Sequence, residues 1–231
     1  MPAGKFEEWS VGGEAVRAYA NVVSDRPAGA MASFQWSGVV VFHPWWGLND
    51  DVLAYADRLA DAGFSVLAPD LVRGRVAATI EDAERLVAGK DDDHADAVAL
   101  AAVDRLAASA GVQRVGLVGF SMGAAHAVWA PTQRPNVACT VVYYGTYTGA
   151  VLTRAKAPVL GHFAETDPYE PDETVQAFER GLRGAGRKAE IHRYPGTGHW
   201  FAEPSRDAWQ PDAANLAFER TAAFLRGQLK R

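Results

Sequence analysis

The sequence predicts an α/β fold, in which a mostly parallel central sheet is flanked by helices. Short apolar runs rich in β-branched residues alternate with longer amphipathic segments, which is the pattern of parallel strands joined by crossover helices. Residues 38–43 form one continuous apolar run, as expected for a strand that is covered on both faces. The run at residues 114–120 leads directly into a serine between two glycines and then into a small-residue helix. This order of strand, sharp turn and helix places a candidate functional residue at the end of a central strand.

The size and composition of the chain predict one globular domain over residues 1–231. A chain of 231 residues with 48% hydrophobic content can bury a sizeable core without a disulfide or metal. No internal repeat or low-complexity linker divides it. The net charge of −5, with no run of lysine or arginine, argues against nucleic acid or membrane partners. We expect a soluble monomer or small homo-oligomer that acts on a small molecule and holds no metal.

The cysteine content and the first residues predict a cytoplasmic location. A single cysteine, Cys139, cannot form an internal disulfide, and residues 1–10 lack the apolar core of a secretory signal. No apolar run approaches the roughly 18 to 20 residues that span a bilayer. Cys139 lies inside a predicted strand, where we expect it to be a small buried hydrophobic residue.

The first 93 residues predict a hairpin, two buried strands and a surface segment. Residues 6–9 and 15–20 flank a Gly-Gly pair and predict an antiparallel pair of edge strands. After the strand at residues 38–43, Asn49 or Asp50 caps a helix that runs to about residue 62. The next buried strand is predicted at residues 64–69. Glycines and acidic residues interrupt residues 71–93, so that segment is expected to be an excursion on the surface, folded over the site or away from it.

The second half of the chain continues the alternation of helices and strands. Helices are predicted at residues 95–109, 122–130, 172–183 and 211–229, and strands at residues 114–120, 137–144, 158–163 and 188–194.

Residues 119–123, Gly-Phe-Ser-Met-Gly, match the nucleophile elbow pattern G-x-S-x-G. In this motif the flanking glycines let strand and helix approach, while the serine takes a strained backbone conformation. The pentapeptide also recurs by chance, but the strand before it and the helix after it are the context that the motif requires. We therefore predict Ser121 as a nucleophile, and a glycine-rich structural turn is the alternative.

A serine nucleophile requires a histidine to take its proton and an acid to orient that histidine. His199 lies in a loop directly after the last predicted strand, from which its side chain can reach over the sheet edge. The other five histidines fit packing, surface or supporting positions: His43, His94, His126, His162 and His192.

The predicted acid is Asp167, which follows the strand at residues 158–163. The order Ser121, Asp167, His199 is that of α/β-hydrolases. Glu165 is the runner-up acid, and a turn aspartate before proline is the structural alternative for Asp167. Asp172 is expected to cap the next helix.

An oxyanion intermediate requires backbone donors, one of which comes from the residue after the serine, Met122. The second comes from the loop after residues 38–43. Pro44 has no N–H group, so Trp45 is the predicted second donor. A plain turn with two packed aromatic residues is the alternative.

With these motifs in place, the chain resembles the dienelactone hydrolase family over most of its length. The resemblance implies an α/β-hydrolase fold without a large lid domain, no cofactor, the triad Ser121, Asp167 and His199, and an oxyanion hole at Trp45 and Met122. The matching stretches are Ala18-Tyr-Ala20 with the later Pro27, His43-Pro-Trp-Trp-Gly-Leu-Asn49, Ala68-Pro-Asp-Leu71, Gly119-Phe-Ser-Met-Gly123, Asp167 with Pro171, and Tyr194-Pro-Gly-Thr-Gly-His-Trp-Phe201.

Three positions depart from the best-known members of that family and make this chain a serine-nucleophile variant. Those members carry a cysteine where this chain has Ser121 and a glutamate where it has Pro44. They also grip a substrate carboxylate with two arginines, and the second of these positions is Glu203 here, which we expect to repel an anionic substrate. Arg73 or Arg75 is the candidate for the first arginine.

Aromatic residues crowd the predicted rim and indicate an apolar pocket for the acyl or alcohol group. The aromatic residues at or beyond strand ends are Trp45, Trp46, Tyr144, Tyr147, Trp200 and Phe201. The predicted substrate-binding set is Trp46, Arg73, Tyr144, Trp200 and Phe201.

The predicted function is hydrolysis of a carboxylic ester or lactone through an acyl-enzyme on Ser121. An acyltransferase or cyclising enzyme of secondary metabolism with the same triad is the first alternative, because a water-poor pocket favours another acceptor. A non-catalytic binding module that keeps the fold is the second. The presence of all three triad residue types argues against this module.

Overall fold

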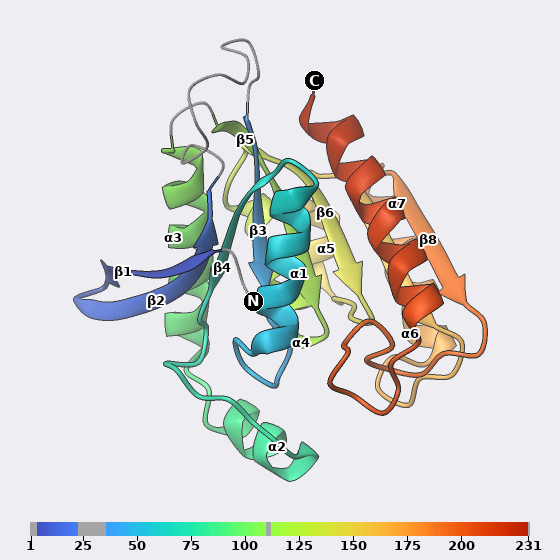
Figure 1. The fold of residues 1–231 in the computed structure, drawn as a ribbon. Helices are drawn as coiled ribbons and strands as arrows, with labels where there is room; N and C mark the ends of the chain where they lie inside the picture. Colours follow the sequence, from blue (N-terminus) through green and yellow to red (C-terminus); the bar gives the residue numbers. More distant parts are fainter. Residues whose placement is uncertain (1–3, 23–35, 110–111, 231) are drawn as a thin grey trace.

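The structure, a computed structural model, describes residues 4–22, 36–109 and 112–230 and forms one eight-stranded sheet covered by helices (Figure 1). The strands are β1 (Lys5–Val11), β2 (Glu14–Asn21), β3 (Trp36–Phe42), β4 (Ser65–Pro69), β5 (Val112–Phe120), β6 (Val137–Tyr143), β7 (Val159–Ala164) and β8 (Ala189–Tyr194). Their order across the sheet is β1-β2-β4-β3-β5-β6-β7-β8. β2 is antiparallel to both of its neighbours, and the other neighbouring pairs are parallel. The predicted α/β fold with a mostly parallel sheet is confirmed.

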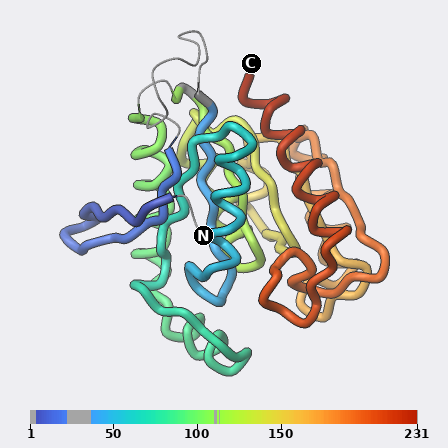
Figure 2. The backbone as a smooth tube through the Cα atoms, viewed as in Figure 1, coloured from blue at the N-terminus to red at the C-terminus, as the bar shows by residue number. Residues whose placement is uncertain are grey.

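Helices cover both faces of the sheet, as the tube in Figure 2 also shows. They are α1 (Asp50–Asp61), α2 (Ile80–Ala88), α3 (Asp92–Ala107), α4 (Met122–Trp129) with a short 3₁₀ turn (Ala130–Thr132), α5 (Ala150–Arg154), α6 (Asp172–Gly184) and α7 (Pro211–Leu229). α1 and α7 pack on one face, and α3, α4 and α6 on the other. Every residue of β4, β6 and β7 is buried, because both faces are covered. No helix in the described ranges is long and apolar enough to cross a membrane.

The structure corrects two of the local predictions and adds one helix. β2 is not an edge strand, because its second side pairs with β4 from Ala18 to Asn21. Asp172 does not cap α6, since Pro171 occupies the cap position and the Asp172 carboxylate binds Arg193 instead. The added helix is α5, which spans five residues and has no side-chain cap, so no local pattern predicts it. Pro27 lies outside the described residues.

The nucleophile elbow depends on two glycines where backbones touch. A Cβ atom on Gly123 would lie 2.4 Å from the Phe42 carbonyl oxygen, and one on Gly119 would lie 2.4 Å from the Gly123 carbonyl oxygen. Both contacts are with backbone, which cannot move aside as a flexible side chain can. Only glycine therefore lets α4 pack this closely on β5 and β3.

We predict that Gly123→Ala lowers the free energy of unfolding by about 1–3 kcal/mol or more, because the new methyl group overlaps the β3 backbone. Gly227→Ala in α7 is the matched control. Nothing lies within 4 Å of its added Cβ, so it should stabilise the helix by about 0.5–1 kcal/mol. Urea unfolding measures both effects. Equal stabilities of the two variants would contradict the close packing at the elbow.

Candidate active site

Three polar side chains meet at the carboxyl ends of the parallel strands. Ser121 follows β5, Asp167 lies in the loop after β7, and His199 lies in the loop after β8. His199 Nδ1 is 2.7 Å from Asp167 Oδ2, and His199 Nε2 is 3.1 Å from Ser121 Oγ. Since a carboxylate only accepts hydrogen bonds, Nδ1–H donates to Asp167 and Nε2 is left to accept from the serine hydroxyl. The three residues thus form one hydrogen-bonded chain.

The Ser121 backbone adopts a conformation that residues with a side chain rarely take. Its φ of 48° lies in the left-handed region, and its N–H donates to the Tyr143 carbonyl at 2.9 Å. Strain of this kind costs on the order of 1–3 kcal/mol and is retained where the surrounding structure enforces it. Here the packing of Gly119 and Gly123 enforces it, and the turn directs Oγ to His199.

Asp167 is a buried carboxylate that three donors hold in place. Its Oδ1 accepts from the backbone N–H groups of Tyr169 (2.9 Å) and Glu170 (3.0 Å), and its side chain is 2% exposed. Burial raises the pKa of Asp167, but the hydrogen bond and charge of His199 and the two backbone donors outweigh burial, so the pKa is lowered overall. Asp167 is therefore ionised at neutral pH and orients the imidazole.

Hydrogen bonds tie the acid loop to the histidine loop. Thr166 N–H donates to the Thr197 carbonyl at 3.1 Å, and Gly196 N–H donates to Glu165 Oε2 at 2.9 Å. Glu165, the alternative acid of the sequence, therefore binds the backbone of the histidine loop and not the imidazole.

Two backbone N–H groups are placed as candidate donors to an oxyanion. Met122 is the first residue of α4, so its N–H has no intrahelical acceptor and lies at the positive end of the helix dipole. After β3, Gly47 N–H donates to the Pro44 carbonyl and closes a turn. Within the part of the chain that the structure describes, the Trp45 N–H in this turn has no hydrogen-bond acceptor.

The His43 side chain holds that turn through a hydrogen bond to its first residue, Pro44. It is fully buried, its Nδ1–H donates to the Pro44 carbonyl (2.7 Å), and its Nε2 accepts from the Leu71 N–H (3.0 Å). Burial lowers the pKa of His43, which keeps the ring neutral, as the acceptor role of Nε2 requires. His43 therefore links the loops that follow β3 and β4.

Three aromatic rings pack around the imidazole of His199. The ring centres of Tyr144 and Tyr169 are each 4.9 Å from it, and that of Trp200 is 5.0 Å away. Tyr144 (φ 35°) and Trp200 (φ 67°) both have left-handed backbones. Sequence patterns do not indicate Tyr169, because it lies in a polar turn just after Asp167.

Most of the aromatic residues expected to contact substrate pack in the core instead. Tyr144 and Phe201 have no measurable exposed surface, and Trp46 is 2% exposed. These three side chains form part of the core next to the site. A substrate would reach them only if the surrounding loops moved. Trp200 is partly exposed and stacks on Trp45, with ring centres 5.8 Å apart.

The arginines expected to bind a substrate carboxylate are engaged elsewhere. Arg73 Nε lies 2.9 Å from Glu14, and its Nη2 lies 3.1 Å from Asp91. Arg75 Nε donates to the Val72 carbonyl. Both guanidinium groups thus have partners within the chain, and their contact with a substrate carboxylate stays a prediction.

An open groove of about 460 Å³ lies beside Trp200. Trp46, Arg206 and residues 78–80 also line it, so the segment that leads into α2 borders this groove. The Arg206 guanidinium carbon lies 3.8 Å over the Trp46 ring. Among the described residues its side chain has no hydrogen-bond or ion-pair partner. Arg206 lies in an irregular loop, so no sequence pattern indicates it.

Glu203 is a buried acid. It is 2% exposed, Tyr144 Oη donates to its Oε1 at 2.8 Å, and Oε2 has no partner in the described part of the chain. Burial raises the pKa of Glu203 to about 8, so the side chain is mostly uncharged at neutral pH. The expectation that Glu203 repels an anionic substrate is therefore wrong.

The remaining histidines have local partners. His126 Nδ1 lies 3.0 Å from Asp96, and His192 Nε2 lies 2.7 Å from Glu190. In the described ranges no group of three or more histidine, cysteine or acidic side chains is placed to hold a metal ion.

Comparison with known proteins identifies relatives over nearly the whole chain. The model of the dienelactone hydrolase family matches residues 22–229. The chain is 29% identical over 208 residues to a Bradyrhizobium protein named "Probable 2-oxo-3-(5-oxofuran-2-ylidene)propanoate lactonase", covering 83% of this chain and 84% of that protein. It is 28% identical over 215 residues to "Protein usf" of Aquifex pyrophilus, covering 87% and 93%.

Solved structures share the fold. A dienelactone hydrolase-like promiscuous phosphotriesterase from metagenomic libraries superposes with a TM-score of 0.82 at 23% identity, covering 98% of each chain. A dienelactone hydrolase from Anabaena variabilis superposes with a TM-score of 0.73 at 21% identity, covering 99% of each chain.

We predict that Glu203→Gln becomes more stable relative to the wild type as the pH rises. The folded protein holds the Glu203 proton up to about pH 8, whereas the ordinary carboxyl pKa is 4.5. The bound proton therefore stabilises the folded wild type fully below pH 4.5, and this stabilisation is lost as the pH rises from 4.5 to about 8. The difference in melting temperature, variant minus wild type, should rise over this range and then level off. A constant difference across the pH range would contradict the burial of a neutral Glu203.

Proposed function

The chain belongs to the dienelactone hydrolase family and hydrolyses an ester or lactone, and we propose that Ser121, His199 and Asp167 carry out the reaction. The observation that supports these roles is the hydrogen-bonded chain from Ser121 Oγ through His199 to the ionised Asp167. It supplies a nucleophile, a proton acceptor and an orienting charge in one line.

The first step of the proposed reaction forms an acyl-enzyme. His199 Nε2 takes the hydroxyl proton as Ser121 Oγ bonds to the substrate carbonyl carbon. The N–H groups of Met122 and Trp45 stabilise the negative oxygen of the tetrahedral intermediate. The intermediate collapses by breaking the bond to the alcohol oxygen, which takes the proton from the imidazolium. In a lactone this alcohol stays attached to the acyl group.

The second step releases the acid. Water gives a proton to His199 Nε2 as its oxygen attacks the acyl carbon, and Ser121 leaves with that proton restored. Asp167 keeps its negative charge throughout, because its three hydrogen bonds favour the ionised form. Its role is to hold Nδ1–H and to stabilise the transient positive charge on the ring.

The chain's cysteine does not compete with Ser121 as a nucleophile. Cys139 is fully buried in β6, and burial raises the pKa of its thiol to about 12. A thiol of this kind supplies almost no thiolate at neutral pH and has no access to substrate.

We propose that the groove beside Trp200 receives the part of the substrate that extends from the scissile bond. Its partly exposed Trp200 suits an apolar group, and the unpaired Arg206 suits an anionic one. Because Glu203 is uncharged and Arg73 is engaged elsewhere, Arg206 is the proposed determinant for a carboxylate.

Ser121→Ala should lower the hydrolysis of short p-nitrophenyl esters by at least about 10³-fold, because no other group at the site can form the acyl-enzyme. A fluorophosphonate probe should label the wild type on Ser121 and leave the variant unlabelled. Cys139→Ala is the control and should keep near-normal activity. Hydrolysis that survives in Ser121→Ala would exclude the proposed nucleophile.

Arg206→Gln should raise KM for an anionic lactone by about tenfold, because a charge-assisted contact to the carboxylate is lost. KM for a neutral lactone of the same ring size should change by less than about twofold. Arg73→Gln is the matched control and should change neither value. Equal effects of Arg206→Gln on both lactones would contradict the assignment.

A further inference from the structure

Tyr144 is held at both ends and packs against His199. Its backbone N–H donates to the His162 carbonyl at 2.7 Å, and its hydroxyl donates to Glu203 at 2.8 Å. Between these two anchors its ring lies 4.9 Å from the imidazole and has no exposed surface. The hydrogen bond at the far end of the ring therefore adds to the packing that fixes its position.

Glu203 belongs to the same loop as the histidine. Its backbone N–H donates to the Trp200 carbonyl at 2.9 Å, and the loop then turns so that the Glu203 carboxyl meets Tyr144. The hydrogen bond from Tyr144 to Glu203 thus joins the loop that carries His199 to the residue after β6, and β6 is the neighbour of β5, which leads into Ser121.

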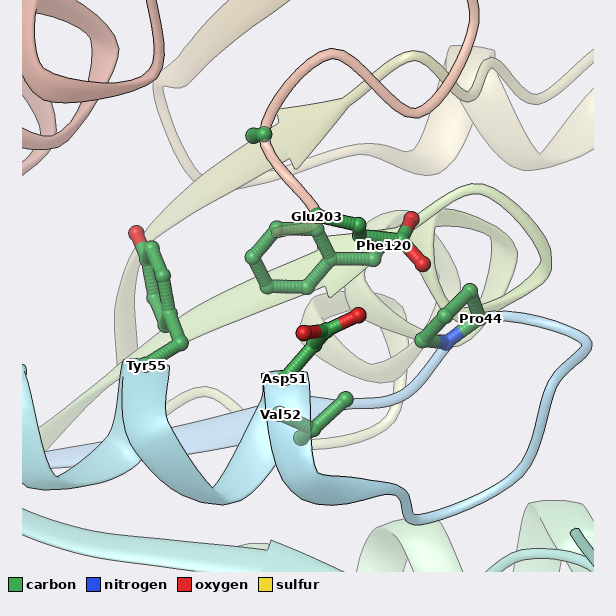
Figure 3. A pocket seen from close by; sticks show the side chains of 7 residues that line it. Pro44, Asp51, Val52, Tyr55, Phe120 and Glu203 are labelled. Carbon is green, nitrogen blue, oxygen red and sulfur yellow. The ribbon is translucent and has the colours of Figure 1, made fainter. Parts of the chain in front are cut away.

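The other side of Glu203 faces a small cavity with room for about one water molecule. Pro44, Asp51, Tyr55 and Phe120 also line it, and Figure 3 shows that the Glu203 and Asp51 carboxyl groups both point into it. Pro44 opens the proposed oxyanion turn, and Phe120 precedes Ser121. The cavity is therefore lined by residues next in sequence to the proposed nucleophile and to the proposed oxyanion donor Trp45.

We propose that Glu203 is a positioning residue for the reaction, which holds Tyr144 against the imidazole and so keeps His199 in line with Ser121 and Asp167. This inference rests on the proposed function. Asp167 and Ser121 each bind one nitrogen of the ring, but two hydrogen bonds in the ring plane leave the ring free to turn about the line that joins the two nitrogens. The packed face of Tyr144 restricts that rotation.

Glu203 performs this role as a neutral acid. Burial raises its pKa to about 8, the Tyr144 hydrogen bond and the Arg206 charge oppose that rise, and the Asp51 charge adds to it. Tyr55, from α1, is the other titratable group on the cavity, and burial raises its pKa to about 12, so it stays neutral. Above pH 8 the ionised Glu203 would face Asp51 in a space that admits little water. We expect the loop to rearrange there and the turnover rate to fall.

Three variants test the hydrogen bond between Tyr144 and Glu203 from both of its ends. Glu203→Ala removes the acceptor and should lower kcat about tenfold or more with a smaller change in KM, because His199 loses its alignment. Tyr144→Phe keeps the ring but frees its end, and should lower kcat in the same direction by less. Glu203→Gln keeps a neutral acceptor, so it should restore kcat at pH 7 to within about threefold of the wild type.

The pH profile separates this role from simple packing. Wild-type kcat for p-nitrophenyl acetate, corrected for spontaneous hydrolysis, should fall with a midpoint near pH 8. Glu203→Gln cannot ionise and should lack this alkaline decline. Glu190→Gln, at an exposed glutamate in β8, is the control and should keep the wild-type profile. An identical decline in wild type and Glu203→Gln, or full kcat in Glu203→Ala, would overturn the inference.

A measurement without substrate distinguishes this inference from the proposed function. The His199 Nδ1 proton, which is hydrogen-bonded to Asp167, should give a proton NMR signal that exchanges slowly in wild type and Glu203→Gln and rapidly in Glu203→Ala. Loss of the signal in Glu203→Ala supports the positioning role even if Ser121 proves not to be the nucleophile. A signal unchanged in Glu203→Ala overturns the role even if Ser121 is the nucleophile.

Discussion

The close approach of α4 to β3 and β5 is the constraint on which the site depends. Because Gly119 and Gly123 bring backbones into contact, Ser121 has to turn through a left-handed conformation. That turn sends Oγ toward His199 and leaves the Met122 N–H at the open end of the helix. Nucleophile and candidate oxyanion donor are thus set by one packing contact, which the folding of the core maintains.

Two acids near the same histidine hold opposite protonation states because their surroundings differ. The Asp167 side chain is 2% exposed within a partly buried residue, whereas Glu203 is buried as a whole residue. Asp167 accepts hydrogen bonds from two backbone N–H groups and from His199, so its charge is stabilised. Glu203 receives a single hydrogen bond from a neutral hydroxyl, and the charge of Asp51 lies nearby. The number and charge of the donors, together with the deeper burial of Glu203, decide which acid ionises.

Local patterns were sufficient wherever the structure depends on neighbours in sequence. Asn49 caps α1 as predicted, because its side chain can reach the N–H of Val52 whatever else surrounds it. Local sequence patterns gave the wrong prediction where a strand or a charged side chain far away in the sequence determines the structure. The second side of β2 pairs with β4, and Asp172 is drawn to Arg193 of β8, and neither partner is visible in a local window.

The sequence by itself determined the fold class, the family and the chain order of Ser121, Asp167 and His199. Each of these residues lies in the turn or loop after a strand, and parallel strands bring their carboxyl ends together. Only the tertiary structure decided that Arg73 is engaged, that Arg206 is unpaired and that Glu203 is neutral. These properties arise from desolvation and from charges brought in by distant segments, and electrostatic energies depend on such distances and not on position along the chain.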